Sequence, residues 1–323
     1  MKKLVALAVL GIAFGHTNAL GQQFPTKPIT LVVPAAAGGP TDTVARMVGE
    51  AMGRRLGQQV IVENMGGAGG TIGMARVAKA PADGYTVAVW HIAQATAPAL
   101  YNNLKYDVVN DFDHIGRIAD VPMTIVSKTG VAAKNTKELF DWIRTEKAKV
   151  TYGHAGVGSA SHLCALIWQK ELGVQMTGVG YRGTGPAMND LISGQFDVMC
   201  DQTTNTTNHI NGGKIKGYAV TTKAKVSSLP DLPTLDSTAL PGFEVSAWHA
   251  MWAPKGLPKE AADKLNAALQ TALKDAKVIE RFASLGTVPV EQSLATPAAL
   301  KSYLTAEVQR WGAVIKAAGV QAN

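Results

Sequence analysis

Short β-branched runs alternate with amphipathic helical patterns along almost the whole chain, and this alternation limits the possible folds most strongly. The first run, residues 29–33, ends at Pro34. A small-residue loop follows, and then a helix that should begin near Asp42, be capped by Thr41 or Asp42, and end at Gly57. Strands that alternate with helices in this way predict the α/β class, with mostly parallel sheets and helices on both faces.

The first 21 residues have the pattern of a secretory signal peptide. Lys2 and Lys3 form a positive start, residues 4–14 are apolar, and Ala19 and Gly21 are the small residues of a cleavage site. No cysteine follows to carry a lipid anchor, and no other stretch approaches 18 apolar residues. We therefore expect an exported protein without a transmembrane helix.

The chain after the signal peptide, residues 22–323, has the length of two ordinary domains. Hydrophobic residues make up 46% of the sequence and charged residues 17%, which is enough to fill a core. The formal charge is +7, and removing Lys2 and Lys3 leaves +5. Because the basic residues are scattered, we expect no nucleic-acid binding, but a mild attraction for anions is compatible with this charge.

The two cysteines, Cys164 and Cys200, are open to two interpretations. In an oxidising compartment they could form a disulfide that stabilises the fold by roughly 3–4 kcal/mol. Cys164 also lies on the apolar face of a predicted helix, where a thiol can serve simply as part of the core. We slightly favour two separate buried thiols.

Two loops rich in small residues, 34–42 and 153–162, follow predicted strands and lead into predicted helices. In open α/β sheets, ligands bind at this edge. Glycine allows the backbone to approach a ligand closely, and a helix N-terminus offers unpaired N–H groups to an anion. Each loop by itself could equally be a tight strand-to-helix connection. Together, the loops predict an anion site.

The sequence does not fit the common enzyme signatures. The glycines of residues 66–73 do not have the spacing of a dinucleotide-binding loop, and Ser159 lacks the flanking glycines of a nucleophile elbow. No metal-binding motif is present, so we expect neither a catalytic residue nor a metal or cofactor. A hydrolase that uses Ser159 and His162 remains the enzymatic alternative, although such a histidine more often hydrogen-bonds to nearby backbone.

Several motifs occur in an order typical of one family. They are PITLVVP (28–34), GGPTD (38–42), the glycine-rich segment 63–73, APADGYT (80–86), GVGSASHL (156–163), YRGTGPA (181–187) and LPDLPT (229–234). Over nearly the whole mature chain, the sequence resembles the Bug-type periplasmic binding proteins of tripartite tricarboxylate transporters. The resemblance implies a periplasmic, monomeric protein that captures a small carboxylate and delivers it to the transporter's membrane components.

The resemblance also implies a two-domain Venus-flytrap fold, with domain 1 formed by residues 22–122 and 248–323 and domain 2 by residues 123–247. The hinge crossovers should lie near residues 120–124 and 245–251. The ligand should lie between the two loops. The implied binding residues are Ala36, Ala37, Gly38, Gly39, Thr41 and Asp42 in the first domain, and Gly158, Ser159, Ser161 and His162 in the second, with Thr184 and Asp201 as weaker candidates.

The sequence departs from the family pattern at His154, where a small hydroxyl residue is more usual, and in the small residues Ala35–Ala37. Small residues could admit a flat ring, and a histidine could contact a second carboxylate. These features suggest an aromatic dicarboxylate such as terephthalate as ligand. Aliphatic di- and tricarboxylates remain alternatives, as does a sensor that signals to a membrane partner.

Overall fold

The computed structural model describes residues 24–319, 321 and 322. The predicted signal peptide, residues 1–21, lies outside the described residues. The strands are β1 (Ile29–Val33), β2 (Val60–Asn64), β3 (Thr86–His91), β4 (Phe112–Ser127), β5 (Thr151–His154), β6 (Thr177–Gly180), β7 (Val198–Gln202), β8 (Lys216–Val220), β9 (Ser246–Pro254) and β10 (Val288–Pro289).

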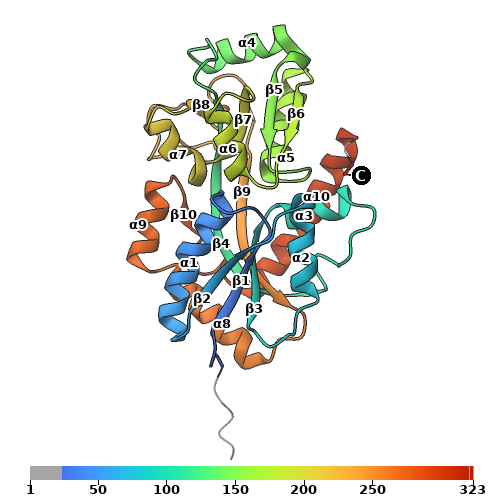
Figure 1. Cartoon of the computed structure of the whole chain (residues 1–323), viewed down its shortest axis with the longest axis vertical. Coiled ribbons are helices and arrows are strands. Elements are labelled where there is room, and N and C mark those ends of the chain that lie inside the picture. The colour runs from blue at the N-terminus through green and yellow to red at the C-terminus, as the bar shows by residue number, and fades with distance from the viewer. Residues whose placement is uncertain (1–23, 320, 323) are drawn as a thin grey trace, which may run out of the picture.

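The helices connect these strands and cover the sheet (Figure 1). They are α1 (Pro40–Leu56), α2 (Thr71–Ala78), α3 (Ala93–Leu100), α4 (Thr136–Glu146), α5 (Ala160–Leu172), α6 (Thr184–Ile192), α7 (Thr203–Asn211), α8 (Lys259–Ala272), α9 (Ala276–Ser284) and α10 (Pro297–Ala318). The α/β prediction is confirmed, and α1 ends at Gly57 in the left-handed conformation, as expected.

The expectation of mostly parallel sheets is wrong. The sheet order is β2-β1-β3-β9-β4-β7-β5-β6, with β8 and β10 also paired to β4. Pairing is parallel within β2-β1-β3 and within β7-β5-β6, but every pair that involves β4 or β9 is antiparallel. The pairs that involve β4 or β9 join strands far apart in the sequence, so no local βαβ unit sets their direction.

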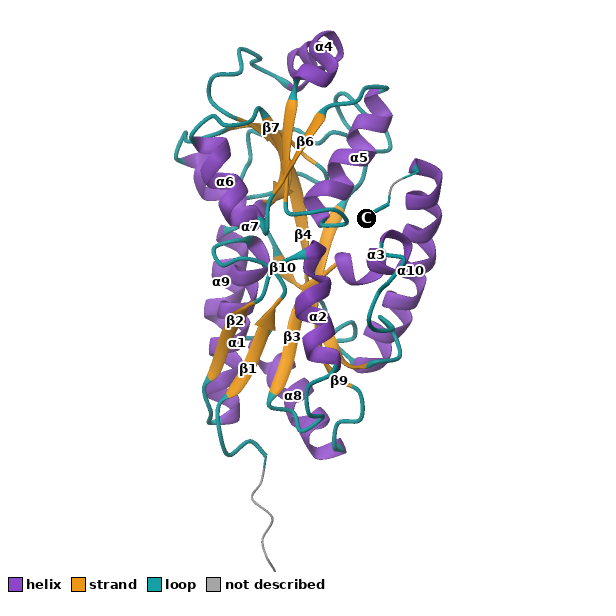
Figure 2. Cartoon of the chain, turned by 45° about the vertical axis from the view of Figure 1, so that its right-hand side comes forward, coloured by secondary structure: helices purple, strands orange, loops and turns teal. Residues whose placement is uncertain are grey.

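The strands β4 and β9 run side by side along the length of the molecule and connect its two lobes (Figures 1 and 2). β4 pairs with β9 as far as Pro122, which is opposite Ser246, and with β7 from Met123 to Ser127. The chain therefore leaves one lobe within a single strand and returns beside it. The domain boundaries at residues 122–123 and 247–248 stay a prediction.

Buried apolar side chains fill both lobes, and one cluster is continuous between them. In the lobe that carries both chain ends, α1 and α8 pack together, and Val48 and Leu265 lie in one cluster with Leu31 of β1. In the other lobe, Phe140 of α4 and Trp168 of α5 are buried with their rings 5.7 Å apart. α10 packs against α3 and β4 along one side (Figure 2). This packing fixes the strand ends where the loops begin.

The cysteines form a disulfide, so the expectation of two separate thiols is wrong. Cys164 lies on α5 and Cys200 on β7, with their Cα atoms 6.0 Å apart. α5 packs against β7, and the apolar face of the helix that carries Cys164 is directed onto that strand. The apolar position therefore serves both as core and as a cross-link.

Within residues 24–319, 321 and 322, no helix combines the length and the apolar character that a membrane crossing requires.

Candidate ligand-binding site

A cavity of about 410 Å³ lies where loops at the carboxyl ends of the strands meet between the two lobes. This volume lies in the range of small-molecule sites. Its lining includes Pro34, Ala35, Gly39–Thr41, Gly67–Gly70, Trp90, His91 and Tyr101 from one lobe, Ala155–Val157, Ser159–Ser161, Tyr181, Arg182, Thr184 and Gln202 from the other, and Gln321 and Ala322 near the C-terminus.

Five helices begin at this cavity. The lining contains the N-cap residues of α1, α2, α5 and α7, which are Gly39, Gly70, Ser159 and Gln202, and the first residue of α6, Thr184. The first turn of a helix has unpaired N–H groups and the positive end of the helix dipole. Converging helix starts therefore create a site that favours anions.

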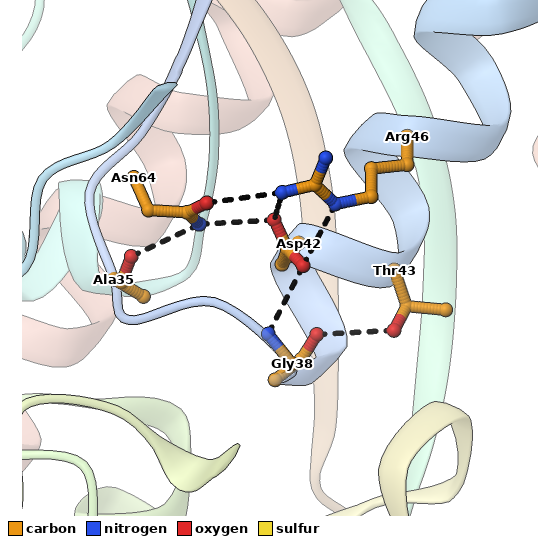
Figure 3. A network of polar contacts seen from close by, with 7 residues as sticks. Ala35, Gly38, Asp42, Thr43, Arg46 and Asn64 are labelled. Carbon is orange, nitrogen blue, oxygen red and sulfur yellow. Dashed lines mark hydrogen bonds and ion pairs between the residues drawn. The ribbon is translucent and has the colours of Figure 1, made fainter. Parts of the chain in front are cut away.

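The first loop, residues 34–39, is held by a charged network (Figure 3). Asp42 accepts hydrogen bonds from the N–H of Gly38 (3.0 Å) and from Arg46 Nε (3.0 Å). Asn64 Nδ2 donates to Asp42 Oδ1 (2.9 Å) and to the carbonyl of Ala35 (3.2 Å). Burial acts to raise the pKa of Asp42, but hydrogen bonds from Arg46, Gly38 and Asn64 outweigh it and lower the pKa below 3.8.

The predicted capping role of Thr41 or Asp42 is wrong. The N-cap of α1 is Gly39, which forms no side-chain cap, because the helix already begins at Pro40. Asp42 thus lies in the first turn and bonds back to the loop. Thr41 instead pairs its hydroxyl with Nε2 of the buried His249 on β9, at 3.0 Å.

The second loop, residues 155–159, is held by neutral groups. His154 Nδ1 accepts from the N–H of Gly156 (3.1 Å), and His162 Nδ1 accepts from the N–H of Gly158 (3.2 Å). Ser159 caps α5 by accepting from the N–H of His162, at 3.3 Å. Burial, and then the neighbouring His154, lower the pKa of His162 to about 3, and burial also lowers that of His154. Both rings are therefore neutral acceptors.

The two lobes touch across the cavity. The N–H of Ala36 donates to the carbonyl of Arg182 (3.1 Å), and the Tyr101 hydroxyl donates to the carbonyl of Val157 (3.1 Å). A Cβ atom at Gly39 would lie 3.3 Å from Thr184 Oγ1 and 3.4 Å from the backbone N of residue 185. A Cβ atom at position 39 would therefore crowd the other lobe slightly, and we expect a branched side chain to hold the lobes apart.

The residues that line the cavity include one group with a full charge, Arg182, and no carboxylate among the part of the chain described. His91 accepts from the N–H of Ala93 at Nδ1 (3.1 Å), and burial lowers its pKa well below 6.5, so it is neutral. The polar lining is otherwise made of hydroxyl, amide and backbone groups. This composition suits an anionic ligand.

The predicted site residues divide into two groups. Gly39, Thr41, Ser159, Ser161 and Thr184 line the cavity. The structure places the remaining predicted residues outside the lining: Ala36, Ala37, Gly38, Asp42, His154, Gly158, His162 and Asp201. Asp42, His154 and His162 hold the loops by accepting hydrogen bonds from loop N–H groups, among them those of Gly38 and Gly158. Ala36 and Ala37 instead contact the segment 182–185 of the other lobe.

Several lining residues were not predicted from the sequence. His91 and Gln202 end β3 and β7, and Tyr181 follows β6, so their places at strand ends could have indicated them. Gln321 and Ala322 reach the cavity from beyond α10; the N–H of Ala322 donates to the carbonyl of Leu100, at 2.9 Å. No local pattern in the sequence indicates that approach.

Comparison with solved structures confirms the fold class. The periplasmic binding protein BugD superposes with a TM-score of 0.90 at 48% sequence identity, over 92% of this chain and 99% of that one. MatC from Rhodopseudomonas palustris, solved with bound malate, has a TM-score of 0.87 at 37% identity, over 90% of this chain and 100% of that one. The fold is therefore the two-domain α/β fold of periplasmic binding proteins.

Sequence comparison agrees. A protein encoded in the TAR-I ttuE-ttuC' intergenic region of Agrobacterium vitis is 54% identical over 92% of this chain and 86% of its own length. The family described as the tripartite tricarboxylate transporter family receptor matches residues 44–320. The chain therefore belongs to the receptor family of the tripartite tricarboxylate transporters.

Proposed function

We propose that this protein captures a small aliphatic dicarboxylate in the periplasm and delivers it to the membrane components of a tripartite tricarboxylate transporter. The observation that carries the proposal is the cavity itself: five helices begin there, and its lining, as far as the chain is described, contains Arg182 and no carboxylate. The bound malate of MatC supports a dicarboxylate of about this size.

The lining has enough donors for useful affinity. A carboxylate at one helix N-terminus is stabilised by roughly 0.3–2 kcal/mol through the dipole. Each hydrogen bond to the charged group adds about 1.5–3 kcal/mol. Thr41 and Ser159 come from the first turn or N-cap of helices in opposite lobes, so both lobes can hold the ligand at once. Micromolar affinity, about −8 kcal/mol, is within reach of such a site.

An aromatic dicarboxylate such as terephthalate is the second candidate. The rings of Trp90, Tyr101 and Tyr181 line the cavity and could pack against a flat ligand. His154, which suggested a contact to a distal carboxylate, lies outside the lining and already accepts a hydrogen bond from Gly156. The three aromatic rings are therefore the remaining support for an aromatic ligand.

The geometry supports binding without chemical change of the ligand. Ser159 Oγ donates to the carbonyl of Gly156 (2.7 Å), and His162 directs Nδ1 at the N–H of Gly158 rather than at a hydroxyl. A serine nucleophile needs a base at its own hydroxyl. We therefore expect the ligand to be recovered intact after incubation with the protein, and a consumed ligand would favour the hydrolase alternative.

A thermal melt of the mature protein against malate, succinate, adipate, citrate, benzoate and terephthalate tests the proposal. A ligand at 100 times its Kd stabilises the native state by about 2.7 kcal/mol. We expect the largest shift with an aliphatic dicarboxylate. A shift confined to terephthalate would select the aromatic candidate, and protein that shifts with none after unfolding and refolding would contradict the carboxylate assignment.

The delivery step has its own test. We expect the ligand-loaded, monomeric protein to bind the transporter's membrane components in pull-down experiments. Binding instead to a membrane signalling protein would identify a sensor.

A further inference from the structure

Asp201 is a buried acidic group beside the cavity, and unlike Asp42 it has no cationic partner among the described residues. It lies on β7 directly before Gln202, which lines the cavity, and its side chain is fully buried. Asn205 Nδ2 donates to Oδ2 at 2.6 Å, whereas Oδ1 is buried without a hydrogen-bond partner. An unpaired buried carboxylate oxygen is costly, and in native proteins it calls for a functional explanation.

No cation compensates a negative charge at this position. β7 packs against β4, β5, α5, α6 and α7. The titratable and charged side chains on those elements are Asp113, His114, Arg117, Asp120, Tyr152, His154, His162, Lys170, Glu171, Asp190 and His209, and Arg182 lies in the cavity lining. Within the described residues none of them is paired with Asp201: Arg117 pairs with Asp120, and the influences on the Asp201 carboxyl are burial and neutral hydrogen bonds.

Thr184 connects Asp201 to the cavity. It lines the cavity, and its hydroxyl is close enough to the Asp201 carboxyl group to lower the pKa of that group, although the two side chains form no hydrogen bond of standard geometry. An ionised Asp201 would attract the hydroxyl hydrogen of Thr184, leaving oxygen lone pairs and a buried negative charge towards the ligand. A neutral Asp201 can donate its own hydrogen to Thr184 Oγ1, so that the Thr184 hydroxyl is free to donate to a ligand carboxylate.

We propose that Asp201 determines specificity for anions by carrying a proton whenever the cavity holds a dicarboxylate, so that ligand binding is coupled to proton uptake. The inference rests on the proposed function. No bond other than the O–H bond of Asp201 changes, and the proton comes from solvent. Deprotonation of Asp201 opposes anion binding, and a ligand that offers a hydrogen-bond donor to Thr184 is favoured instead.

Burial moves the pKa values of the histidine and tyrosine side chains at the cavity away from neutral pH. Burial raises the pKa of Asp201 to about 7. Burial lowers the pKa of His91 well below 6.5, and burial together with the Asp190 carboxylate raises that of Tyr181 to about 12. Burial also lowers the pKa values of His154 and His162, which lie behind the second loop. A change in affinity near pH 7 therefore reports on Asp201.

Isothermal titration calorimetry with malate as probe, in buffers of different ionisation heat from about pH 6 to 8.5, tests the proposal. We expect proton uptake to rise towards one proton per ligand above about pH 7, with Kd rising up to tenfold per pH unit. D201N, which is permanently neutral, should lose both effects. D197N is the matched control. Asp197 precedes β7, is paired with Lys128 and accepts a hydrogen bond from the N–H of Thr151, away from the cavity. This variant should therefore keep the wild-type pH dependence.

Wild-type binding without proton uptake, or D201N with an unchanged pH dependence, would overturn the inference. If neither malate nor adipate binds at any pH, the proposed function fails, and a carbon-13 titration of Asp201 in the free protein then decides the inference independently. The Asp201 resonance can be assigned by comparison with D201N or by sequential correlation in wild type. A titration midpoint near pH 7 would support a neutral carboxyl group, and a midpoint below about 5 would refute it.

Discussion

At the first loop of the cavity a charged network holds the backbone, whereas at the second loop neutral histidines do so. Asp42 of the first network pairs with Arg46, whose side chain is 53% exposed and therefore hydrated. His154 and His162 are both buried, and each accepts from a backbone N–H. Asp42 is as buried as the two histidines, so the difference lies in the partner: the charge of Asp42 is balanced by Arg46, whereas the neutral histidines need no counter-charge.

The same comparison separates contact with the ligand from support of the loop. Thr41 and Ser159 line the cavity, while Asp42 and His162, close to them in sequence, lie behind the backbone. Substitutions at cavity positions should therefore change affinity most. Substitutions behind the loops should change stability and its pH dependence as well.

The largest effect is expected for Gly39→Val. The backbone at Gly39 is extended with φ −90°, which valine adopts readily, but the side chain would meet Thr184 and residue 185 of the other lobe. We expect affinity to fall more than about 1,000-fold, about 4 kcal/mol, with little change in Tm. Calorimetry and a melt measure both.

Gly130→Val is the matched control for this variant. A Cβ atom at Gly130 meets no heavy atom within 4 Å, and this glycine lies outside the cavity lining. If Gly39→Val binds the ligand with wild-type affinity, the first loop is not part of the binding site.

Loss of the disulfide should have the next largest effect and should act on the second loop. Cys164 and Cys200 join α5, which begins at Ser159, to β7, which ends at Gln202. In C164A/C200A we expect the free energy of unfolding to fall by roughly 3–4 kcal/mol, since the unfolded chain is no longer cross-linked. Urea denaturation with and without a reducing agent measures this. The reductant should lower the stability of wild type and leave that of the variant unchanged. An equal effect on both proteins would contradict the prediction.

Acid should weaken the second loop before the first. Unfolded histidine binds a proton below about pH 6.5, whereas folded His162 has a pKa of about 3, so its stabilising contribution is present above pH 6.5 and is lost as pH falls. The contribution of Asp42, whose pKa is lowered, is lost only below about pH 3.8.

Urea denaturation of wild type and His162→Asn between about pH 7 and 5 tests this order. Asparagine keeps an acceptor near Gly158 but does not titrate. Each neutral buried histidine should contribute a decline of about 1.4 kcal/mol per pH unit, so the slope should be smaller by that amount in the variant. Identical slopes would show that His162 is protonated in the folded protein.

The smallest effect is expected for Arg46→Met. The Arg46 side chain is half exposed, and the buried Asp42 keeps its hydrogen bonds from Gly38 and Asn64, so we expect a loss of about 0–1 kcal/mol of stability and a few-fold weaker ligand binding as the first loop loosens. Arg54→Met is the control, because Arg54 pairs with Glu50 and Asp275 away from the cavity. If the two variants change the ligand affinity equally, the Asp42 network does not contribute to ligand binding.

The sequence allowed the α/β alternation and both loops to be predicted because those depend on local patterns. The helices α3 and α7 have weak local signals, because α3 contains Pro98 and α7 is rich in Thr and Asn, so tertiary packing overrides helix propensity there. The full length of β4 also lacks a local signal, because Asp120 and Pro122 interrupt its apolar run. The disulfide and the approach of Gln321 depend on distant contacts, which no single segment encodes.

Trp90 gives the cavity an intrinsic optical reporter. Of the six tryptophans in the sequence, Trp90 is the one that contributes to the lining, and its ring stacks on His91 with centroids 3.8 Å apart. Indole emission depends on nearby polarity and on stacked partners, so a ligand entering the cavity should change the fluorescence of this residue. In wild type, binding could therefore be followed in real time without any label, and Trp90→Phe would give the background of the other five tryptophans.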